Sequence, residues 1–234
     1  MTMAESPDPK QNQRAFFGRR KGHPLKPRQT ALFDTLLPRI AVDTATPAPA
    51  DLRKLFADAD EVRLEIGFGG AEHLIAQAKN HPRAGFIGSD GFVNAIAKAL
   101  TAIDAAKLDN IRLHHGDASE LIDWLPVGGL ARIDLLYPDP WPKRRHWKRR
   151  FIQDESLTRL ARILRKGGEL RFATDIADYA AYALARVLRS PDFVWTAERA
   201  DDWRKPWADF AGTRYEAKAK REGRVPAYFT FRRL

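Results

Sequence analysis

Apolar and polar positions follow two alternating periods from residue 52 onward. Short apolar runs, typical of buried strands, alternate with longer segments in which apolar residues recur every three or four positions, as on one face of a helix. This alternation predicts a parallel sheet with helices on both faces. The predicted strands are Val62–Ile66, Gly85–Gly88, Ile111–Leu113, Ile133–Tyr137 and Glu169–Ala173. The predicted helices are Ala71–Asn80, Asn94–Ile103, Ser119–Leu125, Asp154–Leu164 and Ile176–Leu188.

The two ends of the chain differ from this pattern. Near the C-terminus, Phe193–Ala197 and Tyr228–Arg232 alternate residue by residue, which predicts an antiparallel pair of strands that closes the sheet. Near the N-terminus, Thr30–Ile40 has helix spacing and Pro47–Pro49 is typical of a linker. We therefore predict a basic, partly flexible N-terminal arm over residues 1–50 and a single domain over residues 51–234.

Composition narrows the class of protein and of partner. A chain of 234 residues with 44% hydrophobic residues can bury one sizeable core. No apolar run approaches the roughly 18 residues of a membrane span, and the N-terminus lacks the apolar centre of a secretory signal. A cytoplasmic protein without a membrane partner is therefore expected. The absence of cysteine excludes disulfides and thiolate metal sites, and no metal site is predicted. The net charge of +10 indicates a polyanionic partner, nucleic acid above all.

The first predicted strand, Val62–Ile66, ends in a glycine-rich turn. Gly67 and Gly69 follow Glu65 closely, and glycines let the backbone turn tightly and approach a ligand. In a parallel sheet the ligand lies at the carboxyl ends of the strands. A dinucleotide-binding fingerprint needs a third glycine at position 72, where this chain has Glu72. The turn therefore favours a ligand other than NAD.

The next two strands are also followed by acidic residues. Asp90 follows the second strand, where a carboxylate can hold the hydroxyls of a ribose. Asp117 follows the third strand and can contact the amino group of an adenine. Each residue has a structural alternative, because aspartate often caps the N-terminus of a helix. Three signals on three successive strands together favour a ligand that contains adenosine.

The fourth strand runs into a loop that combines a carboxylate, an indole and many cations. Prolines on both sides hold the loop extended and present Asp139 and Trp141 from a stiff rim. A carboxylate can accept base N–H groups, an aromatic ring can stack on a base, and cations can hold phosphates. The alternatives are a solvated basic segment and a tryptophan that packs within its own loop. The six cations are Lys143, Arg144, Arg145, Lys148, Arg149 and Arg150.

A second group of cations lies in the predicted arm, with the aromatic pair Phe16 and Phe17 nearby. Six Lys or Arg residues and no acidic residue lie between Arg14 and Arg28. This pattern fits an arm that contacts phosphates or a tail that promotes solubility, and the aromatic pair favours an arm that docks. The histidines are predicted to be surface or strand residues rather than catalysts: His114, His115 and His146.

These motifs together resemble a known family. The pattern of Glu-x-Gly-x-Gly, then Asp90, then Asp117-Ala118 resembles the cofactor site of class I S-adenosylmethionine methyltransferases. The segment Pro138–Arg150 is similar to the signature of bacterial tRNA (guanine-N7-)-methyltransferases, the TrmB family. Two further family motifs match Ala173–Asp175 and Thr213–Glu216, so the resemblance covers about residues 60–234.

The resemblance implies a Rossmann-like α/β fold, with a mostly parallel seven-stranded sheet and an antiparallel closing pair. It implies methyl transfer from S-adenosyl-L-methionine to N7 of a guanine in the variable loop of tRNA, by a monomer or homodimer that needs no other protein. Asp139 is the expected catalytic residue, which orients the guanine. The implied cofactor-binding residues are Glu65, Gly67, Gly69, Asp90, Asp117 and Asp139. The implied tRNA-binding residues are Lys143, Arg145, Arg149, Arg150, Asp175, Thr213, Arg214, Tyr215 and Glu216.

The chain departs from the family pattern at two positions, and two other functions stay open. Asp90 stands where the family usually has glutamate, and Pro142 stands where a histidine is frequent.

An NAD-dependent oxidoreductase is one alternative function, against which Glu72 and the basic loop count. A tRNA-binding module without catalytic activity is the other, against which the retained acidic residues Glu65, Asp117 and Asp139 count.

Overall fold

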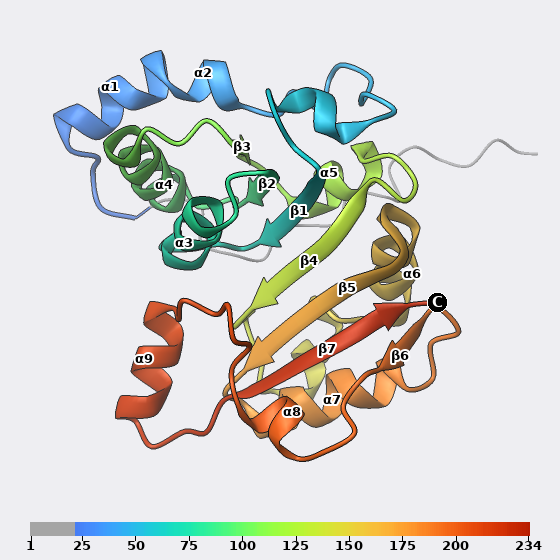
Figure 1. Ribbon diagram of the computed structural model, residues 1–234. Coiled ribbons are helices and arrows are strands. Elements are labelled where there is room, and N and C mark those ends of the chain that lie inside the picture. Colours follow the sequence, from blue (N-terminus) through green and yellow to red (C-terminus); the bar gives the residue numbers. More distant parts are fainter. Residues whose placement is uncertain (1–21) are drawn as a thin grey trace, which may run out of the picture.

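The computed structural model describes residues 22–234, so most cations of the predicted arm lie outside the described part. The centre of the protein is one seven-stranded sheet in the order β3-β2-β1-β4-β5-β7-β6 (Figure 1). The first five strands are parallel, and β7 runs antiparallel between β5 and β6, which confirms the predicted sheet. The strands are β1 Glu61–Ile66, β2 Ala84–Ser89, β3 Ile111–His114, β4 Leu130–Leu136, β5 Leu164–Thr174, β6 Phe193–Trp195 and β7 Ala227–Arg233.

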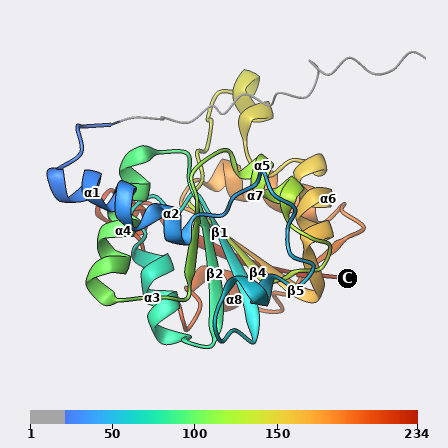
Figure 2. The same ribbon diagram turned by 90° about the horizontal axis from the view of Figure 1, so that it is seen from above.

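Helices cover both faces of the sheet. Helices α3 and α4 lie on one face and α5, α6 and α7 on the other (Figure 2). Two of the helices, α8 and α9, are too polar to show an apolar period and were not predicted. The helices are α1 Pro27–Thr35, α2 Leu37–Ile40, α3 Glu72–Asn80, α4 Val93–Ala106, α5 Ala118–Trp124, α6 Asp154–Ile163, α7 Ala177–Val187, α8 Asp201–Arg204 and α9 Arg214–Arg221, with 3-10 turns η1 Leu52–Leu55 and η2 Arg144–Arg149. Within residues 22–234, none of these helices has the length and apolar character that crossing a membrane requires.

Each face of the sheet has its own apolar core, because successive side chains of a strand point to opposite faces. Leu64 and Ile133 belong to the core beneath α5, α6 and α7. Phe86 and Leu113 belong to the core beneath α3 and α4, which also contains Leu74. The strands therefore have a fixed face, and the side chains at their carboxyl ends are held in register.

The first described residues lie against the domain. Helix α1 packs on α4, and the Val42 N–H donates to the Leu113 carbonyl at the end of β3, at 2.8 Å. The Asn94 side chain at the start of α4 accepts from the Gly22 N–H and donates to the His23 carbonyl, both at 2.8 Å. These contacts place the start of the described chain beside the carboxyl edge of the sheet. The boundary of the arm at residue 50 stays a prediction.

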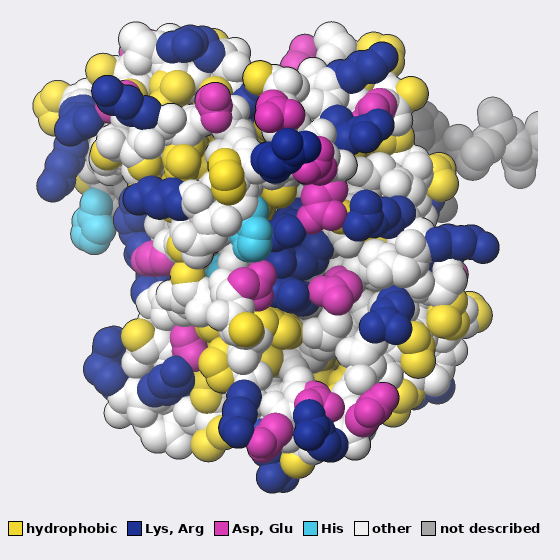
Figure 3. Space-filling model, in the orientation of Figure 1, with side chains coloured by type: hydrophobic (Ala, Val, Ile, Leu, Met, Phe, Trp, Pro, Cys, Tyr) yellow, Lys and Arg dark blue, Asp and Glu magenta, His cyan; other side chains and the backbone are white. Residues whose placement is uncertain are grey.

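A cluster of charges covers one face of the sheet where no helix lies. Arg132 on β4 contacts Asp134 at 2.9 Å and Asp209 at 3.0 Å, and Asp209 also contacts Arg171 of β5 at 2.7 Å. Gln77 of α3 donates to the Asp209 carbonyl at 2.6 Å. Figure 3 shows Lys and Arg side chains beside Asp and Glu side chains at the centre of this face. The segment between α8 and α9 is thus fastened to the sheet by ion pairs.

The Asp209 ion pairs predict a stability that depends on pH. Burial alone raises the pKa of Asp209, but the guanidinium groups of Arg171 and Arg132 outweigh burial and lower it to about 2. A folded-state pKa below the unfolded value of about 4 stabilises the fold above pH 4, and this contribution is lost as the pH falls toward 2. We expect Asp209→Asn to lower the free energy of unfolding by about 2 kcal/mol at pH 7 and by much less near pH 2, measured by urea unfolding. An equal loss at both pH values would contradict this assignment.

Candidate active site

The glycine turn after β1 forms an open cradle. Gly67 and Gly69 have φ angles of 71° and 53°, a region that favours glycine. The Gly67 N–H donates to the Ser89 carbonyl at 2.8 Å, so the turn is tied to the end of β2. A Cβ atom on Gly67 would meet no atom within 4 Å, which leaves this side of the turn open to a ligand. A Cβ atom on Gly69 would lie 3.1 Å from the Tyr215 ring, so the other side is covered by α9.

Asp90 joins the glycine turn to the start of α4. Its carboxylate accepts from the Gly69 N–H at 2.9 Å and from the Phe92 N–H at 2.8 Å. Burial raises the pKa of Asp90, and these two backbone hydrogen bonds act in the opposite direction. The Asp90 carboxylate therefore holds the turn against the start of α4. Each oxygen still has a second lone pair for a ligand.

Asp117 has the capping role that was one of its two interpretations. Its carboxylate accepts from the Ser119 N–H at 2.8 Å at the start of α5. The neighbouring His114 is buried, with its ring nitrogen 3.0 Å from the Ser89 hydroxyl. Burial lowers the pKa of both His114 and His115, so both are neutral at pH 7. Contact of Asp117 with an adenine stays a prediction.

Glu65 lies inside the protein rather than on the open side of the turn. It is 5% exposed, and its carboxylate lies 2.9 Å from Nδ1 of His73 on α3. Burial raises the pKa of Glu65, while the Glu65 carboxylate raises the pKa of His73 against the effect of burial. The contact of Glu65 with His73 holds α3 on β1. Contact of Glu65 with a cofactor stays a prediction.

Asp139 lies at the end of β4, beside the glycine turn. Tyr137 follows the last residue of β4, and its φ of 51° turns the chain sharply before the prolines. The Asp139 side chain is exposed and therefore accessible to a ligand. Burial, with the nearby carboxylates of Asp90 and Asp139, raises the pKa of Tyr215, and Arg214 opposes the shift. Asp90 and Asp139 thus lie within electrostatic range of Tyr215, although the three residues are far apart in the sequence.

The Trp141 ring packs against the basic loop. Its ring lies edge-on to His146 at 5.9 Å, and the Arg149 guanidinium lies 4.9 Å from its centroid. The sequence left two roles open for Trp141, stacking on a base or packing within its own loop. In the structure its ring packs within the loop. Lys143 and Arg145 are exposed on the same loop and can reach a partner.

Arg150 differs from the other cations of this segment because it is buried, with 2% exposure. Its Nε donates to the Pro140 carbonyl at 2.8 Å, and its guanidinium forms an ion pair with Asp178 of α7. It fastens the loop of Asp139 to the domain, and in this conformation it does not face solvent. Three aromatic rings surround the guanidinium at 4.6–4.9 Å: Trp147, Tyr179 and Tyr182.

The motif Thr213–Glu216 forms the start of α9, beside α3. Thr213 caps the helix by accepting from the Glu216 N–H at 3.1 Å. Glu216 is 6% exposed and accepts from the Tyr228 hydroxyl of β7 at 2.6 Å. Asp175, at the end of β5, is paired with Arg224 at 2.5 Å. Glu216 and Asp175 therefore have internal partners, and their contacts with tRNA stay predictions.

Several residues of the site were missed because their partners are distant in the sequence. Two charged residues, Arg132 and Asp134, interrupt the apolar run of β4 at alternate positions, which was an unused signal for a charged sheet face. His73 and Tyr228 carried no signal, since each resembles an ordinary core residue. The pairing of Glu72 with Arg214, 142 positions away, could not be inferred from either segment alone.

The burial of Arg150 predicts a specific loss of stability. Arg150→Met removes the charge, keeps the bulk, and leaves the Pro140 carbonyl without its donor. We expect the free energy of unfolding to fall by about 1–3 kcal/mol, from the Pro140 carbonyl left without a donor and from the lost contacts with the aromatic rings, since Asp178 itself is exposed. The matched control is Lys148→Met on the exposed side of the same loop, which we expect to change stability by less than about 0.5 kcal/mol. Equal stability of the two variants in urea unfolding would show that the Arg150 contacts are dispensable.

Comparison with solved structures identifies the fold. The 16S rRNA methyltransferase KamB superposes with a TM-score of 0.54 at 16% identity, covering 81% of this chain and 94% of that chain. TrmN from Thermus thermophilus superposes with a TM-score of 0.53 at 18% identity, covering 76% of this chain and 45% of that chain. Both similarities show a class I methyltransferase fold, as predicted.

Comparison of sequences is more specific. A family described as putative methyltransferase matches residues 59–228. A tRNA (guanine-N(7)-)-methyltransferase of Nitrobacter hamburgensis is 56% identical over 229 residues, covering 97% of this chain and 90% of the relative. A protein of the same name from Bradyrhizobium diazoefficiens is 56% identical over 228 residues, covering 97% of each chain. This chain belongs to the family of S-adenosylmethionine-dependent tRNA (guanine-N(7)-)-methyltransferases.

Proposed function

We propose that this protein transfers a methyl group from S-adenosyl-L-methionine to N7 of a guanine in the variable loop of tRNA. The observation that carries the proposal is the exposed Asp139 carboxylate, which lies beside the glycine turn and close to Tyr215 of α9. An exposed basic loop follows Asp139 directly. In this proposal, a cofactor site, a base-orienting carboxylate and a phosphate-binding surface meet at one edge of the sheet.

The open side of the glycine turn fits the adenosine and methionine parts of the cofactor. Gly67 leaves room for the backbone to approach the ligand, and Asp90 and Asp117 lie at the ends of the adjacent strands. In this proposal Asp90 accepts from the ribose hydroxyls with the lone pairs that the turn leaves free. The bound cofactor supplies a methyl group that its sulfonium makes electrophilic.

Asp139 acts by positioning in this proposal. N7 of guanine has an in-plane lone pair and no proton to lose, so the reaction needs no general base. The Asp139 carboxylate can accept from the Watson–Crick-edge N–H groups and hold the purine in the orientation for attack. Its negative charge also stabilises the positive charge that develops on the purine. These are the only steps that the chemistry requires of the protein.

The exposed cations supply most of the affinity for tRNA. Lys143, Arg145 and Lys148 are exposed beside Asp139 and are placed to neutralise phosphates. We propose that Arg150 contributes by anchoring the loop rather than by contacting a phosphate. The net charge of +10 fits a cytoplasmic enzyme that acts on a polyanion as a monomer or homodimer.

Methyl transfer can be tested directly. The protein is mixed with unfractionated tRNA and methyl-labelled S-adenosylmethionine, and the tRNA is digested to nucleosides. We expect the label in N7-methylguanosine alone. Label in another nucleoside would overturn the assignment of the target atom, and binding of tRNA without any label would favour a non-catalytic binding module.

Replacing Asp139 is expected to separate chemistry from binding. Asp139→Ala should lower kcat by roughly 100-fold or more, as expected when a preorganised group is removed. Its Kd for tRNA should change little, because the cations of the loop remain. The matched control is Asp34→Ala, an exposed carboxylate on α1, which should leave both quantities unchanged. A fully active Asp139→Ala enzyme would place the catalytic centre elsewhere.

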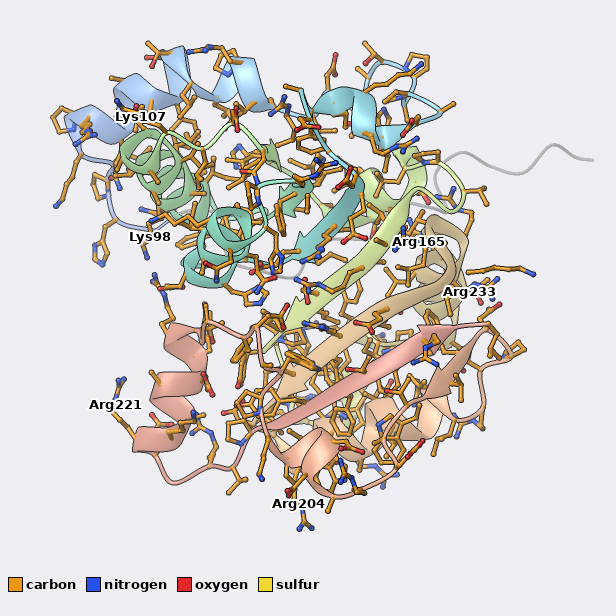
Figure 4. All side chains as sticks on the ribbon, viewed as in Figure 1. Lys98, Lys107, Arg165, Arg204, Arg221 and Arg233 are labelled. Carbon is orange, nitrogen blue, oxygen red and sulfur yellow. The ribbon has the colours of Figure 1, made fainter. Side chains whose placement is uncertain are left out.

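The salt dependence of binding tests the phosphate contacts. The variant Lys143→Ala/Arg145→Ala should reduce the slope of log Kd against log salt concentration by about one unit per lost contact. The control Arg165→Ala/Lys166→Ala removes the same charge at the opposite edge of the sheet, where Figure 4 shows Arg165. A similar slope for both variants would mean that the basic loop is only a solvated surface.

A further inference from the structure

Glu72 has a partner that gives it a role outside any nucleotide-binding fingerprint. It is the first residue of α3, directly after the glycine turn, and Arg214 is the first residue of α9. Two nitrogen atoms of Arg214 donate to the same oxygen of Glu72, at 2.8 Å and 2.5 Å. The two helices that carry the cofactor turn and the motif Thr213–Glu216 are thus joined at their N-termini.

The start of α9 limits the space around two glycines of the turn, Gly69 and Gly70. A Cβ atom on Gly70 would lie 2.1 Å from both the Arg214 guanidinium and the Glu72 carboxylate. A Cβ atom on Gly69 would lie 3.1 Å from the Tyr215 ring. A Cβ atom on Gly70 would displace the ends of these two flexible side chains, and a Cβ atom on Gly69 would press on the Tyr215 ring. The Arg214 and Tyr215 side chains at the start of α9 therefore cover the cofactor turn.

The rest of α9 is held on the sheet. Glu216 is buried against Tyr228, and the preceding segment is fastened by the ion pairs of Asp209. The N-terminus of α9 therefore lies between two fixed points, the sheet and the glycine turn. A displacement of the turn would therefore be transmitted to Thr213 and Tyr215, because close-packed groups transmit strain.

We propose that the Glu72–Arg214 pair is a clamp that couples occupation of the cofactor site to binding of the target guanine by α9. Both are positioning residues and touch neither reacting atom. The inference rests on the proposed function and on the predicted contact of Thr213–Glu216 with the tRNA. Each side chain is 41% exposed, so the pair contributes little to global stability. Its contribution lies in the alignment of N7 with the methyl group, which is sensitive to small displacements.

Coupling of this kind is reciprocal and measurable. If the cofactor site and α9 are linked, S-adenosylhomocysteine tightens tRNA binding by the same factor by which tRNA tightens S-adenosylhomocysteine binding. We expect a factor of about tenfold in the wild type. In Glu72→Gln and in Arg214→Gln the factor should fall close to one, while the melting temperature and the affinity for S-adenosylhomocysteine alone stay near those of the wild type.

A double-mutant cycle and a matched control make the test specific. The variant Glu72→Gln/Arg214→Gln should lose no more coupling than either single variant, since each already breaks the pair. The control is Arg221→Gln, which removes the same charge at the other end of α9, where the side chain points away from the sheet (Figure 4). It should keep the full coupling, even if its affinity for tRNA falls.

Two results would overturn the clamp. One is a wild type in which S-adenosylhomocysteine leaves the affinity for tRNA unchanged. The other is a coupling factor that both single variants retain, or that the double variant loses additively. Either result, with normal formation of N7-methylguanosine, refutes the clamp alone. Failure of the wild type to form N7-methylguanosine refutes the proposed function instead.

Discussion

Two buried guanidinium groups fix the segments that form the site. A guanidinium stays charged when buried and must find acceptors, since an unpaired buried charge is very costly. Arg132 finds an acceptor in Asp209 and so fastens the segment before α9 to the sheet. Arg150 finds one in Asp178 and so fastens the loop of Asp139 to α7. The relative position of Asp139 and α9 therefore depends on two buried charges.

In this arrangement the cofactor turn is held rigidly, whereas the cations of the loop after Asp139 are exposed. The cofactor turn is set by backbone hydrogen bonds to the end of β2 and to Asp90. The cations proposed to bind phosphates are exposed on the loop after Asp139. The chemistry itself asks only for alignment, because guanine N7 is already a nucleophile. A fold that supplies rigid strand ends and an exposed basic surface suits such a reaction.

The sequence predicted the elements better than it predicted the contacts between them. Buried strands and amphipathic helices have periods set by local geometry, and the predicted sheet is confirmed down to its antiparallel closing pair. The motif around Asp139 pointed to the family because prolines, tryptophan and cations rarely occur in that order. Helix α9 was missed because its buried residues are only Glu216 and Ala219. The sequence could not show that Arg150 is buried while its neighbours are exposed, because all of them belong to one run of like charges.

The most direct test of the account replaces the target atom itself. A tRNA is prepared with 7-deazaguanine at the guanine of the variable loop, so that a carbon stands where N7 was and the Watson–Crick edge is intact. We expect the enzyme to bind this tRNA with nearly unchanged affinity. The phosphates are still present, and so are the N–H groups from which Asp139 is proposed to accept hydrogen bonds. We expect no methyl transfer to it. Methylation of the 7-deazaguanine tRNA at the normal rate would contradict the central claim that the strand-end site delivers a methyl group to N7.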